Sequence, residues 1–259
     1  MKIPFCKYQG TGNDFVMIDN RTEFFPKYNR QLIEKMCHRR FGIGADGLIL
    51  LENDPEYDFK MVYFNSDGNE STMCGNGGRC IVRFAHDLGV ISEQTIFNAV
   101  DGLHKATVTP ETISLQMIDV HEIKAQPEDC WFTNTGSPHH VKIVDNVQNF
   151  PIFDYGKQVR YSDLYAPGGT NVNVVSIDEN QNISLRTYER GVEDETLSCG
   201  TGTTAVALIL HHLGKVTDNK VKLEVLGGTL WVSFQLENRV YKNVYLEGAA
   251  TKVFEGVFK

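Results

Sequence analysis

The order of apolar and polar positions along the chain predicts many short strands and few helices. Short apolar or alternating runs, which are typical of strands, occupy residues 15–19, 48–51, 59–64, 106–108 and 113–117. Runs of the same kind predict further strands near residues 139–144, 171–177, 183–189, 221–225, 229–235 and 243–246. Helical spacing predicts helices over residues 28–40, 76–88 and 201–213. The last two are followed by Gly89 and Gly214, and glycine is the residue type that most often ends a helix.

An internal repeat relates the two halves of the chain. The segment that contains Cys74 aligns without gaps on the segment that contains Cys199, at a constant offset of 125 positions (188 − 63, 199 − 74 and 214 − 89). The residues identical in both segments are Tyr63/Tyr188, Glu70/Glu195, Cys74/Cys199, Gly75/Gly200, Gly77/Gly202, His86/His211, Leu88/Leu213 and Gly89/Gly214. Such repeats indicate duplicated architecture. We therefore predict an α+β fold of two structurally similar lobes, residues 1–119 and 120–247, each a mostly antiparallel, barrel-like sheet around a central helix.

Composition narrows the classes of function. A chain of 259 residues with 41% apolar side chains buries a sizeable core without disulfides. The six cysteines form no Cys-x-x-Cys pair and no secretion signal is evident, so we expect a cytoplasmic protein. Because no run of about 18 apolar residues occurs, we expect no membrane partner. A net charge of −8 argues against a nucleic-acid partner.

Two cysteines, Cys74 and Cys199, each stand directly before a predicted helix in a Cys-Gly-x-Gly sequence. The first turn of a helix has unpaired backbone N–H groups and a positive partial charge, so it binds anions and stabilises a thiolate. The glycines leave these N–H groups open to a small ligand. A single cysteine before a helix is most often a buried core residue, but its recurrence at equivalent positions in both lobes favours a functional pair.

The paired cysteines suggest a reaction. If the lobes face each other across a cleft, a ligand carboxylate sits between the two helix N-termini with one sulfur on either side of its α-carbon. One thiolate then removes the α-proton and the opposite thiol returns a proton to the other face, which inverts the configuration. Backbone N–H groups stabilise the charge that moves into the carboxylate, each by about 3 kcal/mol in a dry site. The prediction is an isomerase, an amino-acid epimerase or racemase without cofactor or metal, whose active site lies in this cleft.

Several polar residues near these loops suit an amino-acid ligand. Arg190 is expected to hold a second carboxylate, and Glu189 an ammonium group. Asn13, Asn65 and Asn171 lie in turn-like segments, where the alternative to substrate binding is ordinary turn chemistry. The expected partner is therefore a small amino-acid substrate.

Several ordered motifs resemble the diaminopimelate epimerase family over essentially the whole chain. They are Gly10-x-Gly12-Asn13-Asp14-Phe15, Phe64-Asn65-x-Asp67-Gly68, Cys74-Gly75-Asn76-Gly77-x-Arg79-Cys80, Pro138-His139, Tyr188-Glu189-Arg190-Gly191 and Cys199-Gly200-Thr201-Gly202. The resemblance implies interconversion of LL- and meso-diaminopimelate in lysine and peptidoglycan precursor synthesis, with Cys74 and Cys199 as the two bases and without pyridoxal phosphate. It also implies a homodimer, and a last strand, residues 248–259, that returns to the first lobe.

The resemblance also assigns expected roles to individual residues. The positions that match substrate contacts are Asn13, Asn65, Gly75, Asn76, Asn171, Glu189, Arg190, Gly200 and Thr201. His139 and Glu189 match residues that modulate the thiols, although His139 taken alone is equally open to a structural role. Some members carry Gln where Gly47 stands and Asn where Ser137 stands. No side-chain contact is carried over to these two positions.

Some of these motifs also occur in other classes of protein. Residues 42–47 match G-x-G-x-x-G, but a helix precedes them and a strand follows, the reverse of a dinucleotide site. Proline or hydroxyproline is an alternative substrate, which Asn76 disfavours because the proline racemase pattern has His after its first Cys-Gly. A cysteine hydrolase would use one cysteine with His139 as its base. A redox sensor would join Cys74 to Cys199.

Overall fold

The computed structural model describes residues 2–71 and 73–259, which divide into two compact units. Unit 1 comprises the chain up to Leu115 together with Gly248–Lys259, and unit 2 comprises Gln116–Glu247. The sequence predicts residue 119 as the end of the first lobe, whereas the first segment of unit 1 ends at Leu115. The predicted α+β class is confirmed: each unit contains mostly antiparallel strands and one central helix, and the two units repeat one plan.

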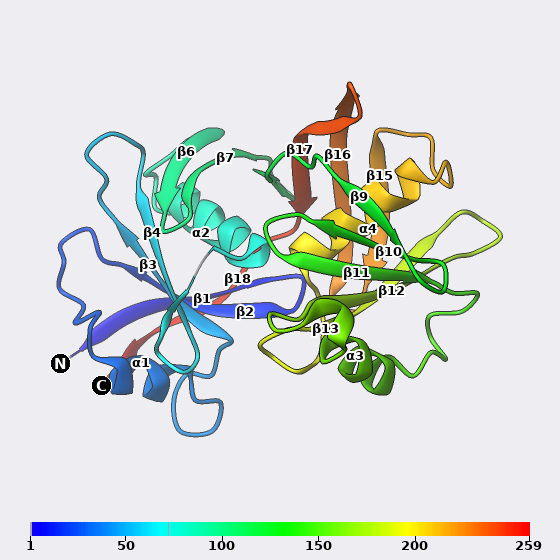
Figure 1. Ribbon diagram of the computed structural model, residues 1–259. Helices are drawn as coiled ribbons and strands as arrows, with labels where there is room; N and C mark the ends of the chain where they lie inside the picture. Colours follow the sequence, from blue (N-terminus) through cyan, green and yellow to red (C-terminus); the bar gives the residue numbers. More distant parts are fainter. Residues whose placement is uncertain (1, 72) are drawn as a thin grey trace. The chain divides into compact units, whose positions relative to one another are not determined.

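Unit 1 is built around strands from both ends of the chain. In chain order its elements are β1 (Ile3–Gly10), β2 (Asn13–Asp19), α1 (Arg30–Cys37), β3 (Gly47–Glu52), β4 (Lys60–Asn65), β5 (Glu70–Ser71), α2 (Gly75–Asp87), β6 (Gln94–Ala99), β7 (Gly102–Val108), β8 (Ile113–Gln116) and β18 (Thr251–Phe258). Strand β18 pairs antiparallel with β1, which pairs antiparallel with β2 (Figure 1). Strand β2 is parallel to β3, and β4 is parallel to β6.

Helix α2 forms the centre of unit 1. Its residues from Gly75 to Ala85 are all buried, and the helix packs against β1, β2, β3, β7 and β18. The helix ends at Asp87 with Leu88 as its C-cap, and Gly89 follows with a φ of +68°, which a residue with a side chain rarely adopts. The shorter helix α1 packs on β3, where its Ile33 and Met36 join Leu48 and Leu50 in one apolar cluster. Strand β3 is consequently buried along its whole length, as its uninterrupted apolar sequence predicts.

Unit 2 repeats this plan with one additional helix. Its elements are β9 (Ile123–Gln126), β10 (Cys130–Asn134), β11 (Pro138–Ile143), α3 (Ile152–Arg160), the 3-10 helix η1 (Asp163–Tyr165), β12 (Asn171–Ile177), β13 (Ile183–Glu189), β14 (Asp194–Thr196), α4 (Gly200–His212), β15 (Lys220–Val225), β16 (Gly228–Glu237) and β17 (Val240–Gly248). Helix α4 is central and contacts β10, β11, β12, β15 and β16 (Figure 1). It is followed by Gly214, whose φ of +67° matches that of Gly89.

The duplication extends to the register of the strands. In unit 1, β2 and β3 are parallel and Phe15 pairs with Gly47. In unit 2, β11 and β12 are parallel and His139 pairs with Asn171. The short parallel contact between β4 and β6 is likewise matched by one between β13 and β15. The repeat therefore preserves the pairing of the strands as well as the sequence. Cys74 and Cys199 consequently lie at equivalent points of their own units.

Two helices differ from the sequence prediction. Helix α1 spans Arg30–Cys37 instead of residues 28–40, because the Asn29 side chain accepts the Leu32 N–H as an N-cap and His38 adopts an extended conformation. Helix α3 was not predicted, since it is nine residues long and contains Gly156. Gly156 is required there because a Cβ would lie 2.4 Å from Tyr188 Cβ. In the described part of the chain, no helix has both the length and the apolar character needed to cross a membrane.

Candidate active site

Cys74 is the N-cap residue of α2. Its Sγ accepts a hydrogen bond from the Gly77 backbone N–H at 3.2 Å, and the side chain is half-buried. The backbone N–H groups of the first helical turn carry a positive partial charge, and Gly77 directs one of them at the sulfur. This geometry favours the thiolate form of Cys74 over the thiol.

Two asparagines lie beside the Cys74 sulfur. Asn13 Oδ1 is 3.7 Å from Cys74 Sγ and accepts a weak hydrogen bond from Asn76 Nδ2 at 3.4 Å. The Asn13 amide nitrogen donates in the opposite direction, to Asp46 Oδ2 at 2.5 Å. Asn13 follows a tight turn between β1 and β2, in which Thr11 has a φ of 51°. A strained turn and an anchoring carboxylate therefore hold the Asn13 oxygen toward the thiol.

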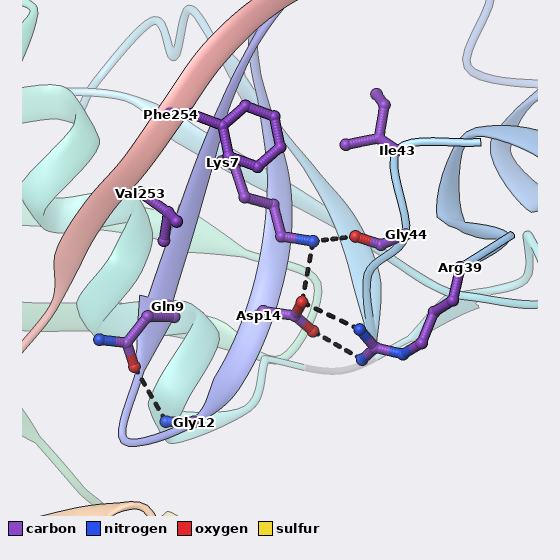
Figure 2. Close-up of a pocket in the computed structure, with 9 residues that line it drawn as sticks. All are labelled: Lys7, Gln9, Gly12, Asp14, Arg39, Ile43, Gly44, Val253 and Phe254. Carbon is purple, nitrogen blue, oxygen red and sulfur yellow. Dashed lines mark hydrogen bonds and ion pairs between the residues drawn. The ribbon is translucent and has the colours of Figure 1, made fainter.

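An ion-pair cluster anchors Asp46 and the neighbouring Asp14. Arg39 bridges the two carboxylates, at 2.6 Å from Asp46 and 2.8 Å from Asp14. Figure 2 shows Asp14 between Arg39 and Lys7, which contacts Asp14 at 2.8 Å and donates to the Gly44 carbonyl. Burial alone raises the pKa of Asp14, but hydrogen bonds from Arg39 and Lys7 lower it to about 2. Lys7, Asp14 and Arg39 line a pocket of about 460 Å³ whose lining includes neither Asp46 nor Cys74. The cluster is thus a support behind the site.

The remaining candidate residues of unit 1 lie close to this arrangement in the fold. Gly75 is the first residue of α2, and Asn65 is an exposed residue at the end of β4. Gly47 pairs with Asn65 across β3 and β4. A Cβ on Gly47 would lie 2.5 Å from both Tyr63 Cε2 and the Phe64 carbonyl oxygen. The Tyr63 ring occupies the space of a side chain at position 47, which explains why this chain has glycine there.

In unit 2, Cys199 is the N-cap residue of α4 and is 7% exposed. Its Sγ lies 3.5 Å from the Thr201 hydroxyl, and Gly200 is the first residue of the helix. Unlike Cys74, Cys199 makes no side-chain cap hydrogen bond to the helix backbone. The two cysteines therefore share a position in the fold but differ in their immediate partners.

A directed chain of hydrogen bonds leads to Cys199 from β11 and β12. Asn173 Nδ2 donates to the His140 carbonyl at 3.0 Å and also contacts His139 Nδ1 at 3.1 Å. The carbonyl only accepts, so Nδ2 is the amide nitrogen and His139 Nδ1 must be the acceptor. The proton of neutral His139 then sits on Nε2, which donates to Thr201 Oγ1 at 2.9 Å. The Thr201 hydroxyl proton is consequently available to Cys199 Sγ.

His139 is neutral at physiological pH. It is completely buried, and burial together with the positive charge of Arg190 lowers its pKa to about 3. His139 is therefore an uncharged hydrogen-bond donor, and its described link to Cys199 passes through Thr201.

Three other candidate residues meet at the ends of β12 and β13. Asn171 is buried, donates to Ser137 Oγ and the Pro138 carbonyl, and accepts the Arg190 backbone N–H at 2.9 Å. Glu189 accepts the Thr196 hydroxyl at 3.0 Å. The Arg190 side chain contacts the Gly168 carbonyl at 3.3 Å. Asn171 thus fixes the backbone that presents Arg190.

The sequence predicts no role for three residues that support the side chains beside the two cysteines: Asp46, Arg79 and Asn173. Asp46 lies in the G-x-G-x-x-G segment, which the order of elements excludes as a dinucleotide site, and Arg79 lies in the motif Cys74-Gly75-Asn76-Gly77-x-Arg79-Cys80. Asn173 occurs in an apolar strand, where a buried amide is itself a signal because it needs partners. Across the residues that the structure describes, no group of three or more His, Cys, Asp and Glu side chains is arranged to hold a metal ion.

Comparison with known proteins assigns the chain to a family. The family model described as diaminopimelate epimerase matches residues 5–120 and 131–253. A protein named diaminopimelate epimerase from Flavobacterium psychrophilum is 58% identical over 250 residues, which cover 96% of this chain and 97% of that protein. One from Chlorobaculum tepidum is 45% identical over 95% of this chain and 98% of that protein.

The fold also has relatives among solved structures. A Bacillus anthracis phenazine biosynthesis protein of the PhzF family matches with a TM-score of 0.79 and 14% identity, covering 100% of this chain and 99% of that one. At this identity the likeness concerns the fold alone. The match of the family model and the close sequence relatives show that the chain belongs to the diaminopimelate epimerase family.

Proposed function

We propose that this chain interconverts LL- and meso-diaminopimelate by moving a proton between its two active-site thiols, without a cofactor. The observation that carries the proposal is the repeated placement of a cysteine at the N-cap of the buried central helix in each unit. Membership of the diaminopimelate epimerase family supports the choice of substrate.

In the proposed mechanism the α-carbon of the substrate is held between Cys74 and Cys199. The thiolate of one cysteine takes the α-proton and becomes a thiol, and the electron pair moves into the carboxylate. The other thiol then gives its proton to the opposite face of the carbon and becomes a thiolate. Backbone N–H groups at Gly75 and Gly200 begin the two helices and are suited to stabilise the carboxylate charge.

The distal end of the substrate also carries an ammonium and a carboxylate. We propose that Glu189 contacts this ammonium and Arg190 this carboxylate, with Asn65, Asn76 and Asn171 completing the binding site. Asn13 and Thr201 are proposed to contact the reacting end, since each lies next to a cysteine sulfur in its own unit. His139 is proposed to tune Cys199 through Thr201.

The test is incubation of the purified protein with LL-diaminopimelate in D2O. Proton NMR and chiral chromatography should show the meso isomer forming with one deuterium at the inverted α-carbon. Proline, trans-4-hydroxyproline and glutamate are assayed in parallel and should not be inverted. Inversion of one of these compounds, with diaminopimelate unchanged, would assign the protein a different substrate.

We further propose that the protein is a cytoplasmic homodimer. Strand β18 supports self-association because Val253, Phe254 and Val257 are each about half exposed on it. Analytical ultracentrifugation should give twice the mass of one chain, and Phe254→Glu should lower it. A single-chain mass for the unaltered protein at micromolar concentration would contradict the dimer, and cell fractionation tests the location.

A further inference from the structure

The two thiols lie in different electrostatic surroundings. The inference from this difference rests on the proposed function and adds which of the two thiols is ionised before substrate binds. We propose that in the substrate-free enzyme Cys74 is the thiolate and Cys199 the thiol, because Arg79 places a permanently charged, buried cation at the first site only. Arg79 is then a positioning residue that acts on the Cys74 end of the reaction.

Arg79 is a residue of α2 whose side chain contacts the first turn of that helix. Its side chain is fully buried and donates to the Asn76 Oδ1 and Thr11 Oγ1 atoms, both at 2.9 Å, and to the Gly75 carbonyl at 3.3 Å. Its Nε has no hydrogen-bond partner among the residues that the structure describes. The guanidinium therefore links the helix start at Cys74 to the β1–β2 turn that carries Asn13.

The positive charge of Arg79 lacks a carboxylate counterpart. Among the described residues no Asp or Glu forms an ion pair with it, and its electrostatic partners are Cys80 and Cys74. A buried charge without an opposite charge is costly, so an anion that forms beside Arg79 stabilises the site. Cys80 is fully buried, and burial raises its pKa far above the usual range, so it stays a thiol. Of the two thiols, Cys74 is therefore the one that can form this anion.

The second unit has no such cation at the equivalent position. The repeat aligns Arg79 with Thr204, whose hydroxyl donates only to the Gly200 carbonyl at 3.0 Å. It also aligns Asn76 with Thr201, and here the hydrogen bond comes from His139. The basic residue near Cys74 is Arg79, which is always charged. The basic residue near Cys199 is His139, which is neutral near pH 7.

Two neutral groups act against this difference. The Asn13 oxygen faces Cys74 as a hydrogen-bond acceptor, which suits a thiol, and the Thr201 hydroxyl can donate to Cys199, which suits a thiolate. The full charge of Arg79 outweighs these neutral dipoles, because charged interactions are stronger than neutral ones in a buried site.

Other charged groups near the two sites do not reverse this difference. Close to Cys74, Asp101 accepts the Met73 backbone N–H, but it is paired with His104 at 3.3 Å. Near Cys199, Glu189 and Arg190 carry opposite charges and are both partly exposed. Partial exposure lets water screen them, whereas Arg79 is shielded from water completely.

The experiment is a titration of the intact, substrate-free protein labelled with 13C at cysteine Cβ. The Cβ shift reports ionisation of each cysteine whether or not the sulfur is accessible, and Cys74→Ser and Cys199→Ser assign the two signals. We expect the Cys74 midpoint to lie at least about one pH unit below that of Cys199. A Cys199 midpoint equal to or below that of Cys74 would overturn the proposal without any further variant.

The role of Arg79 is tested by comparing Arg79→Gln with Arg83→Gln. Arg83 lies one turn further along α2 and donates to the Thr109 carbonyl, so its variant removes the same charge without touching Cys74 or Asn76. We expect Arg79→Gln to raise the Cys74 midpoint by about one unit, Arg83→Gln to leave it unchanged, and Arg79→Lys to restore most of the difference. An unchanged midpoint in folded Arg79→Gln would exclude Arg79 as the cause.

These titrations are independent of turnover. If the protein failed to invert diaminopimelate but kept the expected order of midpoints, the proposed substrate would be wrong and the inference about the thiols would stand. The converse result, inversion with the midpoints reversed, would reject the inference alone. If Arg79→Gln does not fold, the order of midpoints in the intact protein still decides whether Cys74 is the resting thiolate.

Discussion

Asn13 donates its side-chain N–H to Asp46, and this bond turns the Asn13 oxygen toward the Cys74 sulfur, 3.7 Å away. The G-x-G-x-x-G segment that carries Asp46 therefore contributes a carboxylate to the support of a thiol. Arg39 fixes Asp46 from the opposite side at 2.6 Å. The orientation of the Asn13 amide beside the Cys74 sulfur thus depends on Asp46, which has no described contact to that sulfur.

Replacing Asp46 should consequently impair turnover. In Asp46→Ala the Asn13 amide loses its anchor, and we expect kcat/KM to fall by about 10²-fold, since displacement of a reacting group by about 1 Å has an effect of this size. Asp19→Ala is the control, because it removes an Asp paired with Arg21 at 2.6 Å on the surface of the same unit. Steady-state assays of both variants, with melting temperatures, provide the comparison. Equal kcat/KM for Asp46→Ala and the unaltered protein would reject the support role.

The tautomer of His139 offers a second test. In Asn173→Asp the carboxylate can only accept a hydrogen bond from His139 Nδ1–H, so the single proton of neutral His139 moves from Nε2 to Nδ1 and Nε2 no longer donates to Thr201. We expect kcat to fall by about 10-fold or more while the protein stays folded, because the effect reaches Cys199 through one hydroxyl group. Asn146→Asp is the control, since the exposed Asn146 oxygen accepts the Gln148 N–H and an Asp oxygen does the same. The hydrogen-bond chain is wrong if both variants keep full kcat.

His140 should govern part of the acid stability of the protein. It lies between the hydroxyls of Tyr155 and Tyr165, both at 2.8 Å, and burial, assisted by Lys142, lowers its pKa to about 4. The unfolded chain binds this proton near pH 6.5, so stability is lost as the pH falls from about 6.5 to about 4. In His140→Gln the free energy of unfolding should fall less steeply over this range, by about 1.4 kcal/mol per pH unit.

Urea unfolding at a series of pH values measures the slope for His140→Gln. The control is His121→Gln, which changes an exposed histidine and should keep the slope of the unaltered protein. An identical slope for all three proteins would show that protonation of His140 does not contribute.

Close packing at Gly47 predicts an effect on stability. A Cβ at this position meets the Tyr63 ring and the Phe64 carbonyl at 2.5 Å, so Gly47→Ala should lower the free energy of unfolding by about 1–3 kcal/mol. Gly168→Ala adds the same methyl group where no atom of the described residues lies within 4 Å, and it should be close to neutral. The packing argument fails if chemical denaturation gives both variants the same stability.

The sequence predicted those features whose cause is local. The Cys-Gly-x-Gly segments and the glycines after each helix define the ends of α2 and α4 within a residue or two, because capping depends on neighbouring residues. The repeat then predicted a common fold for the two units. By contrast, Asp46 meets Asn13 across 33 positions of sequence, and Asn173 meets His139 across 34. These contacts depend on the parallel pairing of β2 with β3 and of β11 with β12, which no local pattern specifies.

The most direct test of the account is the inversion assay applied to Cys74→Ala and Cys199→Ala. Each variant should lose conversion of LL- to meso-diaminopimelate by about 10³-fold or more, because either proton transfer is then without its acid or base. Arg83→Gln should retain conversion. Near-normal inversion in D2O by either cysteine variant would contradict the mechanism with two thiols.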